Sequence, residues 1–321
     1  MRRTGSVPGE AGTGQAPAGR GAGGGHGPAH TDADPVRLVT LHVWRIPHRS
    51  LPRALVRVAV DRRRLRALPG VRFGKLLGTG TGDGFGPTDA DPSRWAALVV
   101  WSDPARAAEF DETAVGRAWH AIATAAVRLD LRPLASRGRW AGVEPFGVRS
   151  TVSRPVVRTG RDAAAAPAHD AGEPDTPDIG EPRRPDAGRT DAPGRPLLAL
   201  TRARLRPHRA VAFWRAVPPV AAALRTAPGL LARFGIGEAP IGWQGTVSVW
   251  RDTTSLTDFA YRHPEHRAAI IRTPREGWYA EELFARFEVC GLAGDPAVLD
   301  WIGQDGDRGW RCWPGVRSRQ R

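Results

Sequence analysis

The sequence predicts an α+β fold in which two fused ferredoxin-like (βαββαβ) repeats form an intramolecular dimeric α+β barrel. The first observation is a repeat, because LVTLHVWRIPHR and LLALTRARLRPHR are each followed by a Pro-Gly turn, a Val-Trp-x-Asp motif and a trailing Phe. The second is periodicity, which alternates in each copy between that of strands and that of helices. Helices cover one sheet face of such a unit, so two copies in one chain can cover each other's remaining faces.

Each element of the first copy has a local signal. Val39, Leu41 and Val43 alternate with other residues at the period of a half-buried strand. Ser50 is placed to cap the helix that follows, and Pro69-Gly70 turns the chain into the next strand. The further elements expected are strands at 71–77, 95–102 and 131–139 and a helix that starts at Asp103 and Pro104.

The second copy repeats this order. Its expected strands are 197–205, 230–236, 246–251 and 283–290, with helices from about 209 to 225 and from 253. Proline removes a backbone donor and clashes with the preceding turn. Pro218 and Pro219 are therefore expected to bend or split the first helix, and Pro264 the second.

Composition divides the chain into segments. Stretches rich in Gly, Pro, Ala and Arg with almost no apolar periodicity cannot bury enough surface to fold. The expected segments are a disordered tail at 1–35, the first half at 36–150, a disordered linker at 151–195, the second half at 196–293 and a basic tail at 294–321.

Charge and cysteine usage narrow the class of protein. The net charge is +14, but the arginines are spread along the chain and no RNA- or DNA-binding motif occurs, so no nucleic-acid partner is expected. Two cysteines are too few for a disulfide framework, and neither a membrane-spanning run nor a signal peptide is recognisable. We expect a cytoplasmic protein, with peripheral membrane contact open if its substrate is a lipid.

Strand alternation also predicts which side chains face the shared interior. Leu98 and Val100, like Val247 and Val249, form the more uniformly apolar set and are expected to meet the helices. The opposite face then lines an inner cavity for a large flat or long apolar ligand. The residues expected on that face include Trp44, Trp101 and Trp250, named as substrate-binding, and the cations Arg202 and Arg204. The alternative is that the tryptophans fill a barrel core.

A glycine-rich stretch, GTGTGDGFGPTDADPS, follows the strand at 71–77. It matches neither the dinucleotide nor the phosphate-loop spacing. Gly78, Gly80, Gly82 and Gly84 are candidates for close approach to a substrate or for a mobile lid, and a flexible hairpin is the alternative. Lys75, which is the only lysine, precedes them and suits a carboxylate.

Histidines are the candidate ligands of a metal or haem. No paired metal-ligand spacing is present, but haem needs only one axial histidine. The candidates within ordered segments are His42, His120, His263 and His266. His266 opens the helix EHRAAIIR, where Arg272 and Arg275 can neutralise propionates; an exposed helix-start residue is the alternative. Cys290 is ranked as a packing residue and not as a thiolate ligand.

The segment EGWYAEELFARF carries several groups able to do acid–base chemistry. Glu281 and Glu282 are candidates for proton delivery, and Tyr279 for a hydrogen-bond donor. The alternative is that all three satisfy the last strand.

Four motifs, FGKLLGTGTGDGF, RGRWAGVEPF, RFGIGEAP and EGWYAEELFARF, resemble the spheroidene monooxygenase family. The resemblance implies haem, O2 and an external electron donor such as ferredoxin, used to oxidise an acyclic carotenoid at C-2 to an alcohol and then a ketone. Positions that match the family are Lys75, the Gly78–Gly84 loop, Gly235, Gly237, Glu238, Trp278, Tyr279, Glu281 and Glu282. The resemblance also implies that His266 is the family's histidine.

These observations lead to the hypothesis of a haem-dependent monooxygenase acting on an acyclic carotenoid or another long polyene. His266 would bind the iron, and one site would form between the unequal halves. Two alternatives remain open. One is a cofactor-free or haem-degrading oxygenase of the same fold, and the other is a non-catalytic module that sequesters a polyene or haem.

Overall fold

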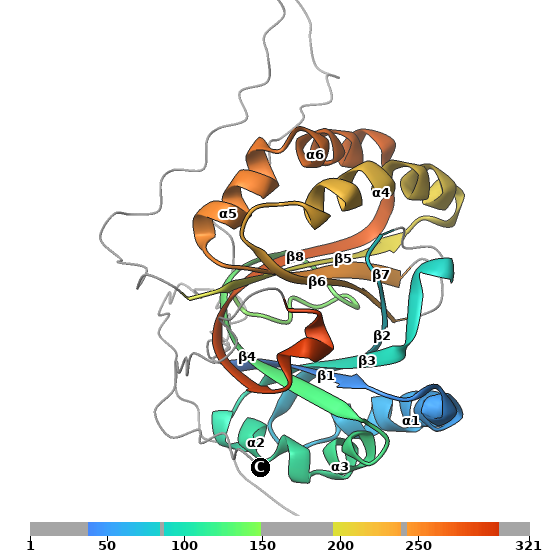
Figure 1. The fold of residues 1–321 in the computed structure, drawn as a ribbon, viewed down its shortest axis with the longest axis vertical. Helices are drawn as coiled ribbons and strands as arrows, with labels where there is room; N and C mark the ends of the chain where they lie inside the picture. Colours follow the sequence, from blue (N-terminus) through green and yellow to red (C-terminus); the bar gives the residue numbers. More distant parts are fainter. Residues whose placement is uncertain (1–37, 84–86, 149–194, 239–242, 302–321) are drawn as a thin grey trace, which may run out of the picture. The chain divides into compact units, whose positions relative to one another are not determined.

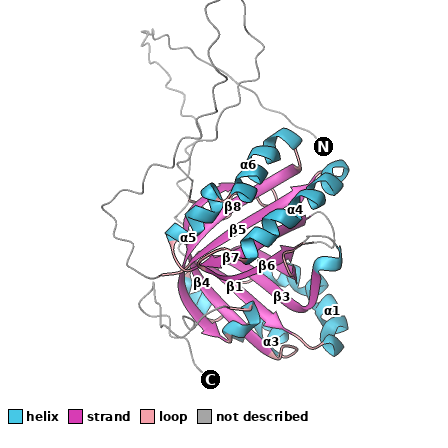
Figure 2. Ribbon diagram, turned by 45° about the horizontal axis from the view of Figure 1, so that its top comes forward, coloured by secondary structure: helices cyan, strands magenta, loops and turns pink. Residues whose placement is uncertain are grey.

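The computed structural model describes residues 38–83, 87–148, 195–238 and 243–301. Its strands close into an antiparallel barrel in the order β1-β3-β2-β6-β7-β5-β8-β4 (Figures 1 and 2). The first half contains β1 (Leu38–Arg45), α1 (Leu51–Arg66), β2 (Val71–Gly80), β3 (Ala90–Trp101), α2 (Pro104–Ala108), α3 (Ala114–His120) and β4 (Ala125–Gly138). The second contains β5 (Leu197–Leu205), α4 (Ala210–Arg225), β6 (Leu230–Gly237), β7 (Trp243–Trp250), α5 (Thr253–Thr257), α6 (Pro264–Glu276) and β8 (Tyr279–Gly294). The expected closed α+β barrel is confirmed.

Two seams join the halves. The β4–β8 seam is long, running from Val127 opposite Gly294 to Gly138 opposite Leu283. The β2–β6 seam is short and pairs Gly78, Thr79 and Gly80 with Gly237, Ile236 and Gly235. The strand order is β2-β3-β1-β4 in the first half and β6-β7-β5-β8 in the second. Both outer strands of each half therefore pair with the other half.

Both ends of the glycine-rich stretch belong to strands. β2 continues to Gly80 and β3 begins at Ala90, so the connection between these strands is shorter than the stretch 78–93. A Cβ at Gly80 would lie 2.6 Å from the carbonyl oxygen of Asp89. Gly82 adopts a φ of 80° and lies against the backbone of Gly235. The close approach that these glycines permit is thus between β2, β3 and β6.

Prolines had unequal effects. α6 begins at Pro264 as expected, and the π-helical turn Asp258–Arg262 precedes it. α4, however, continues through Pro218 and Pro219. Both prolines lie on its exposed side, where water can serve the carbonyls that lose their amide partners. Ser50 stands at the N-cap of α1 without a side-chain cap bond, whereas Asp103 caps α2 by accepting from the Ala105 amide at 2.8 Å.

The predicted strand faces were reversed. Leu98, Val100, Val247 and Val249 point into the barrel, in an apolar core to which all eight described strands contribute. Trp44 and Trp101 instead pack under α1–α3, and Trp250 packs with residues of α4 and α5. The prediction failed because both faces of the sheet are buried: Leu41 and Val43 on one side and His42 and Trp44 on the other are all at most 2% exposed. The predicted Trp-lined inner cavity is replaced by a packed core.

Arg202 does point inward as predicted, although the repeat aligns it with His42. Leu38 and Leu197 both pair with the last tryptophan of the neighbouring strand, which sets the true equivalence between β1 and β5. Counted from these two leucines, the second copy has one more residue than the first before its Pro-His-Arg motif, so the motifs are one residue out of step with the strand pairing.

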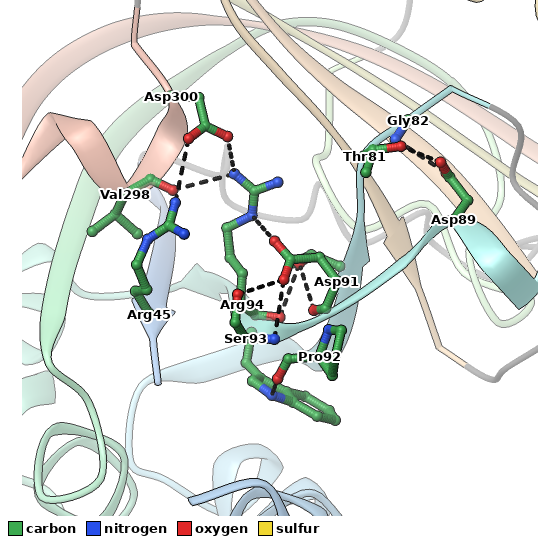
Figure 3. A network of polar contacts seen from close by, with 12 residues as sticks. Arg45, Thr81, Gly82, Asp89, Asp91, Pro92, Ser93, Arg94, Val298 and Asp300 are labelled. Carbon is green, nitrogen blue, oxygen red and sulfur yellow. Dashed lines mark hydrogen bonds and ion pairs between the residues drawn. The ribbon is translucent and has the colours of Figure 1, made fainter. Parts of the chain in front are cut away.

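A segment beyond the expected end of the second half closes the barrel. Val298 and Leu299, in the 3₁₀ turn Pro296–Leu299, belong to the barrel core, so the boundary predicted at 293 falls too early. The buried Arg94 donates to Asp300 at 2.7 Å and to the Val298 carbonyl at 3.3 Å (Figure 3). Arg45 donates to the other Asp300 oxygen at 3.3 Å.

We predict that Leu299→Ala lowers the free energy of unfolding by about 2–5 kcal/mol, because it leaves a cavity in the barrel core. Urea denaturation would measure the change. Ile270→Ala is the control: Ile270 is 43% exposed on α6, so its truncation is expected to cost no more than about 0.5 kcal/mol. Equal losses in the two variants would contradict the role of Leu299 as a core residue.

Candidate functional site

Four charged side chains from four elements meet on the inner side of the barrel wall. Glu238, which follows β6, accepts from Lys75 Nζ of β2 at 2.6 Å on Oε2 and from Arg202 Nη2 of β5 at 2.7 Å on Oε1. Arg202 also pairs with Glu281 of β8. The Arg202 side chain is only 2% exposed. The two cations and two carboxylates balance, which is the condition under which buried charges are tolerated.

Trp140, from the segment after β4, completes this charged network. Its indole Nε1 donates to Glu238 Oε1 at 2.6 Å. The Lys75 ammonium and the Arg202 guanidinium lie 5.9 Å and 5.6 Å from its ring centroid, within cation–π range. Lys75 and Glu238 come from different halves, so the network connects β2 to β6 beyond the short seam.

Glu281 is held as a carboxylate. Burial would raise its pKa, but the amides of Gly142 and Ala141 donate to it at 2.8 Å and 3.0 Å and, with Arg202, hold its pKa below the ordinary value. At neutral pH it therefore carries no proton to deliver, so this geometry favours a structural over an acid role for Glu281. Lys75 and Glu281, both named from the sequence, belong to this one charged network, whereas sequence reasoning assigned no role to Trp140, although this residue lies in RGRWAGVEPF.

We predict that Arg202→Met costs about 3–5 kcal/mol of unfolding free energy, because it leaves two buried carboxylates without their shared cation. Arg132→Met is the matched control: Arg132 is 50% exposed beside Glu288, and its loss is expected to cost about 1 kcal/mol or less. Chemical denaturation of both variants measures the difference. Similar costs would show that the buried network has no special weight.

His266 lies elsewhere, on the helix side of the second half. Its Nδ1 is 2.7 Å from the carbonyl oxygen of Ala260 in the π-helical turn, and its ring packs 5.1 Å from that of Phe259. Burial, opposed by the Ala260 bond and reinforced by His263, lowers its pKa. The imidazole is therefore neutral at neutral pH. Because Nδ1–H donates to the carbonyl, Nε2 carries the lone pair, which is the arrangement that a histidine metal ligand requires.

The sheet face under α4–α6 is covered less completely than its counterpart. In the first half, one continuous apolar cluster fills the layer between sheet and helices. In the second half this layer holds two separate small clusters, and α6 contributes no buried residue. Ala199, Thr201 and Thr246 on the strands are only partly buried. The second half thus presents a floor of small side chains that solvent can reach.

Several polar atoms around this layer have no hydrogen-bond partner within the described residues. They are the indole nitrogens of Trp214 and Trp278, the Gln244 amide nitrogen and His263 Nδ1. Trp278 is 2% exposed and packs with Phe213 and Tyr279. Buried donors are normally paired, so these atoms can accept further partners such as water or a ligand. Burial raises the pKa of Tyr279 to about 12, and the phenol therefore stays protonated.

Other predicted site residues are not brought to His266. Arg275 lies nine residues further along α6, on the opposite face of the helix, and is exposed. The Arg272 guanidinium stacks over Trp278 at 5.4 Å. Glu282 is partly buried on β8, on the opposite sheet face from Glu281. Gly78, Gly80 and Gly82 belong to the seam, and Gly84 lies outside the described residues. The predicted single site between the halves is thus divided between the charged network inside the barrel and His266 outside it.

His42, another candidate ligand, is committed to the first half's core. Its Nε2 lies 3.1 Å from Thr40 Oγ1, which also accepts from the Trp101 indole at 2.9 Å. Its ring lies 4.0 Å from that of Phe110. Burial, reinforced by Arg128, lowers the pKa of His42 to about 3. This histidine is neutral and packed.

We predict that His42 makes the fold acid-sensitive. Below about pH 6.5 this histidine is protonated in the unfolded chain. In the folded chain it stays neutral down to about pH 3, because its pKa is lowered to about 3. Stability is therefore lost as pH falls through that window. Urea unfolding at several pH values in this window measures the change. The free energy of unfolding should depend less steeply on pH in His42→Gln than in the exposed control His48→Gln. Identical slopes would contradict the assignment.

A hollow of about 410 Å³ lies beside the Arg94–Asp300 ion pair. It is lined by arginines and aspartates, among them Arg94, Arg233, Asp91 and Asp300. Its mixed charges make it a poor match for an apolar ligand. Among the residues that the structure describes, no group of three His, Cys, Asp or Glu side chains is arranged to hold a metal ion. None of the helices in these residues is long and apolar enough to cross a membrane.

Comparison with known proteins decides the family. No protein-family model matches the chain. The spheroidene monooxygenase of Rhodobacter capsulatus is 34% identical over 259 residues, which cover 80% of this chain and 89% of that protein. The chain belongs to the spheroidene monooxygenase family. The family's members in Cereibacter sphaeroides and Rubrivivax gelatinosus are 30% and 29% identical over 74% and 70% of this chain, and over 60% and 72% of their own lengths.

Membership in the spheroidene monooxygenase family makes the chain an oxidoreductase of the monooxygenase class. Solved structures similar to it include an aldoxime dehydratase, with 14% identity, a TM-score of 0.49 and coverage of 79% of this chain and 82% of that one. A monooxygenase-like protein from Listeria innocua has 9% identity and a TM-score of 0.24, over 78% and 94% of the two chains. Neither score is high enough to carry an argument.

Proposed function

We propose that the protein is a haem-dependent monooxygenase that oxidises an elongated apolar polyene of the carotenoid class, at C-2 if it follows its relatives. It would take O2 and electrons from an external donor such as ferredoxin. Support for the substrate class comes from the relatives, which are named spheroidene monooxygenases. They align with most of this chain's length. The observation that carries the cofactor is the hydrogen bond from His266 to Ala260.

Haem fits the residues present around His266. The bond to Ala260 leaves Nε2 free of its proton and fixes the ring plane. Ala199, Thr201 and Thr246 offer small side chains on a partly accessible sheet face, as a flat ring requires. The unpartnered indole and amide donors nearby suit carboxylate oxygens such as propionates. When bound, haem iron would supply the activation of O2.

The chain's own residues would prepare this site. Phe259 and the Ala260 carbonyl orient the His266 ring, and burial keeps that ring neutral so that its lone pair stays available. Trp278 and Phe213, packed edge to face at 5.6 Å, keep water from one side of the layer. The Tyr279 phenol stays protonated and can donate a hydrogen bond to an oxygen atom of the substrate.

The two halves are, in this proposal, copies of one ancestral βαββαβ unit. The matching strand orders and the recurrence of Pro-His-Arg and Val-Trp-x-Asp support the duplication. The copies would since have diverged in function. The first has filled its helix layer with aromatic side chains, and the second has kept its layer accessible for a cofactor.

We predict that the purified protein supplied with haem shows a Soret band, and that His266→Ala loses or shifts it, because the axial nitrogen is gone. His208→Ala is the matched control, since His208 is exposed at the start of α4. Absorption spectra during haem titration give the result. No Soret band, or an unchanged one in His266→Ala, would contradict the proposal.

The same preparation separates the alternative functions. Oxidation of a carotenoid by metal-free protein would favour a cofactor-free oxygenase. Loss of haem during turnover would favour haem degradation. Substrate binding without O2 consumption, with any reductant, would favour a module that only sequesters its ligand.

A further inference from the structure

Helix α1 turns an apolar stripe toward solvent. The residues of α1 that are fully buried against the sheet are Ala54, Asp61 and Leu65, which share one side of the helix. On the rest of the helix, Leu55, Val56 and Val60 are 56%, 57% and 41% exposed. These are three of the large apolar side chains that the described chain leaves most accessible, and they lie within two turns of one helix. We call this group the α1 stripe.

Arginines border the α1 stripe on both sides. At 100° per residue, Arg53 and Arg57 lie along one border and Arg62 and Arg66 along the other. Arg63 lies between them near the end of the helix, and Arg53, Arg57 and Arg63 have no ion pair within the described residues. The only acidic residue of α1 is Asp61, which is 0% exposed. The outward face therefore combines exposed apolar side chains with arginines and carries no acidic residue.

This combination matches one class of partner. A nucleic acid would be bound by the arginines alone, and its phosphates would have no use for Leu55, Val56 and Val60. The interface of an anionic bilayer takes up both parts, because apolar side chains enter the boundary of the acyl chains while arginines reach the headgroups. We propose that α1 docks the protein on the surface of an anionic lipid bilayer, lying parallel to the membrane plane.

The corresponding helix of the second half does not share these features. α4 occupies the same place in its βαββαβ unit, and its exposed Val211 is 55% accessible. Only two arginines, Arg215 and Arg225, lie on this helix, and two prolines interrupt its outer side. Docking would thus be a property of the first half, on the layer that the cofactor proposal does not use. The inference goes beyond the proposed function and does not require it.

The test uses the full chain and vesicles that contain no carotenoid. Co-sedimentation compares vesicles of phosphatidylcholine with vesicles of phosphatidylcholine and phosphatidylglycerol. We expect binding to the anionic vesicles that weakens with salt. Leu55→Ser, Val56→Ser and Val60→Ser together should lower the partition coefficient by about tenfold or more. Val211→Ser on α4 is the control and should change it by less than about twofold.

A second variant separates charge from apolar contact. Arg53→Gln, Arg57→Gln and Arg63→Gln together should weaken binding to anionic vesicles by at least about tenfold and remove most of its salt dependence. Circular dichroism and thermal melting verify that each variant is folded, which is expected because all the substituted side chains of the stripe are exposed. Activity on detergent-dispersed substrate should be unchanged in both variants.

Several results would overturn the inference. Failure to recover the full chain with anionic vesicles at low salt is one such result, and unchanged binding by the triple serine variant is another. Equal loss in Val211→Ser would remove the special role of α1. A dimer that the triple serine variant abolishes, without vesicle binding, would assign the stripe to a second copy of the chain. Duplex DNA that binds through the arginines regardless of the serine substitutions would assign it to nucleic acid.

Discussion

Closure of the barrel around a dry apolar interior is the constraint on which the rest of the structure depends. Every strand turns one face inward, and the halves share a single core that neither could cover alone. The two halves pair through seams of unequal length. β4 and β8 pair along nearly their whole length, whereas β2 and β6 share three pairs of residues. The Lys75–Glu238 ion pair and the bond from Arg233 to Asp83 at 2.7 Å reinforce the short seam with side chains.

The helix layers outside the barrel differ in how completely side chains fill them. Under α1–α3, stacked rings such as Trp44 and Trp119, 5.1 Å apart, leave little room for a ligand. Under α4–α6 the sheet is only partly covered, and a neutral, oriented imidazole stands beside it. The partly accessible sheet face that a ligand needs therefore lies in the second half.

The sequence was sufficient for the barrel and insufficient for its faces. Alternation and turn residues located every strand, because these signals are local. Alternation could not show whether Trp44 or Leu98 faces the barrel interior, because both faces of the sheet are buried and apolar. One additional residue before the second Pro-His-Arg motif puts the visible repeat out of step with the strand pairing. Motif positions such as Lys75, Glu238 and Glu281 did converge, but their mutual neutralisation depends on long-range pairing that no local pattern encodes.

The short β2–β6 seam gives the molecule a preferred line of parting. Amide protection against solvent exchange depends on how many bonds must break together, and far fewer hold this seam than the β4–β8 seam opposite. The barrel would open first by separation of β2 from β6, while β4 and β8 stay paired. Gly78, Gly80 and Gly82, which permit the strands to approach, contribute no side chains to this edge, so its side-chain links come from neighbouring pairs such as Lys75–Glu238 and Arg233–Asp83. Transient access to the interior would therefore be gained beside Lys75 and Glu238.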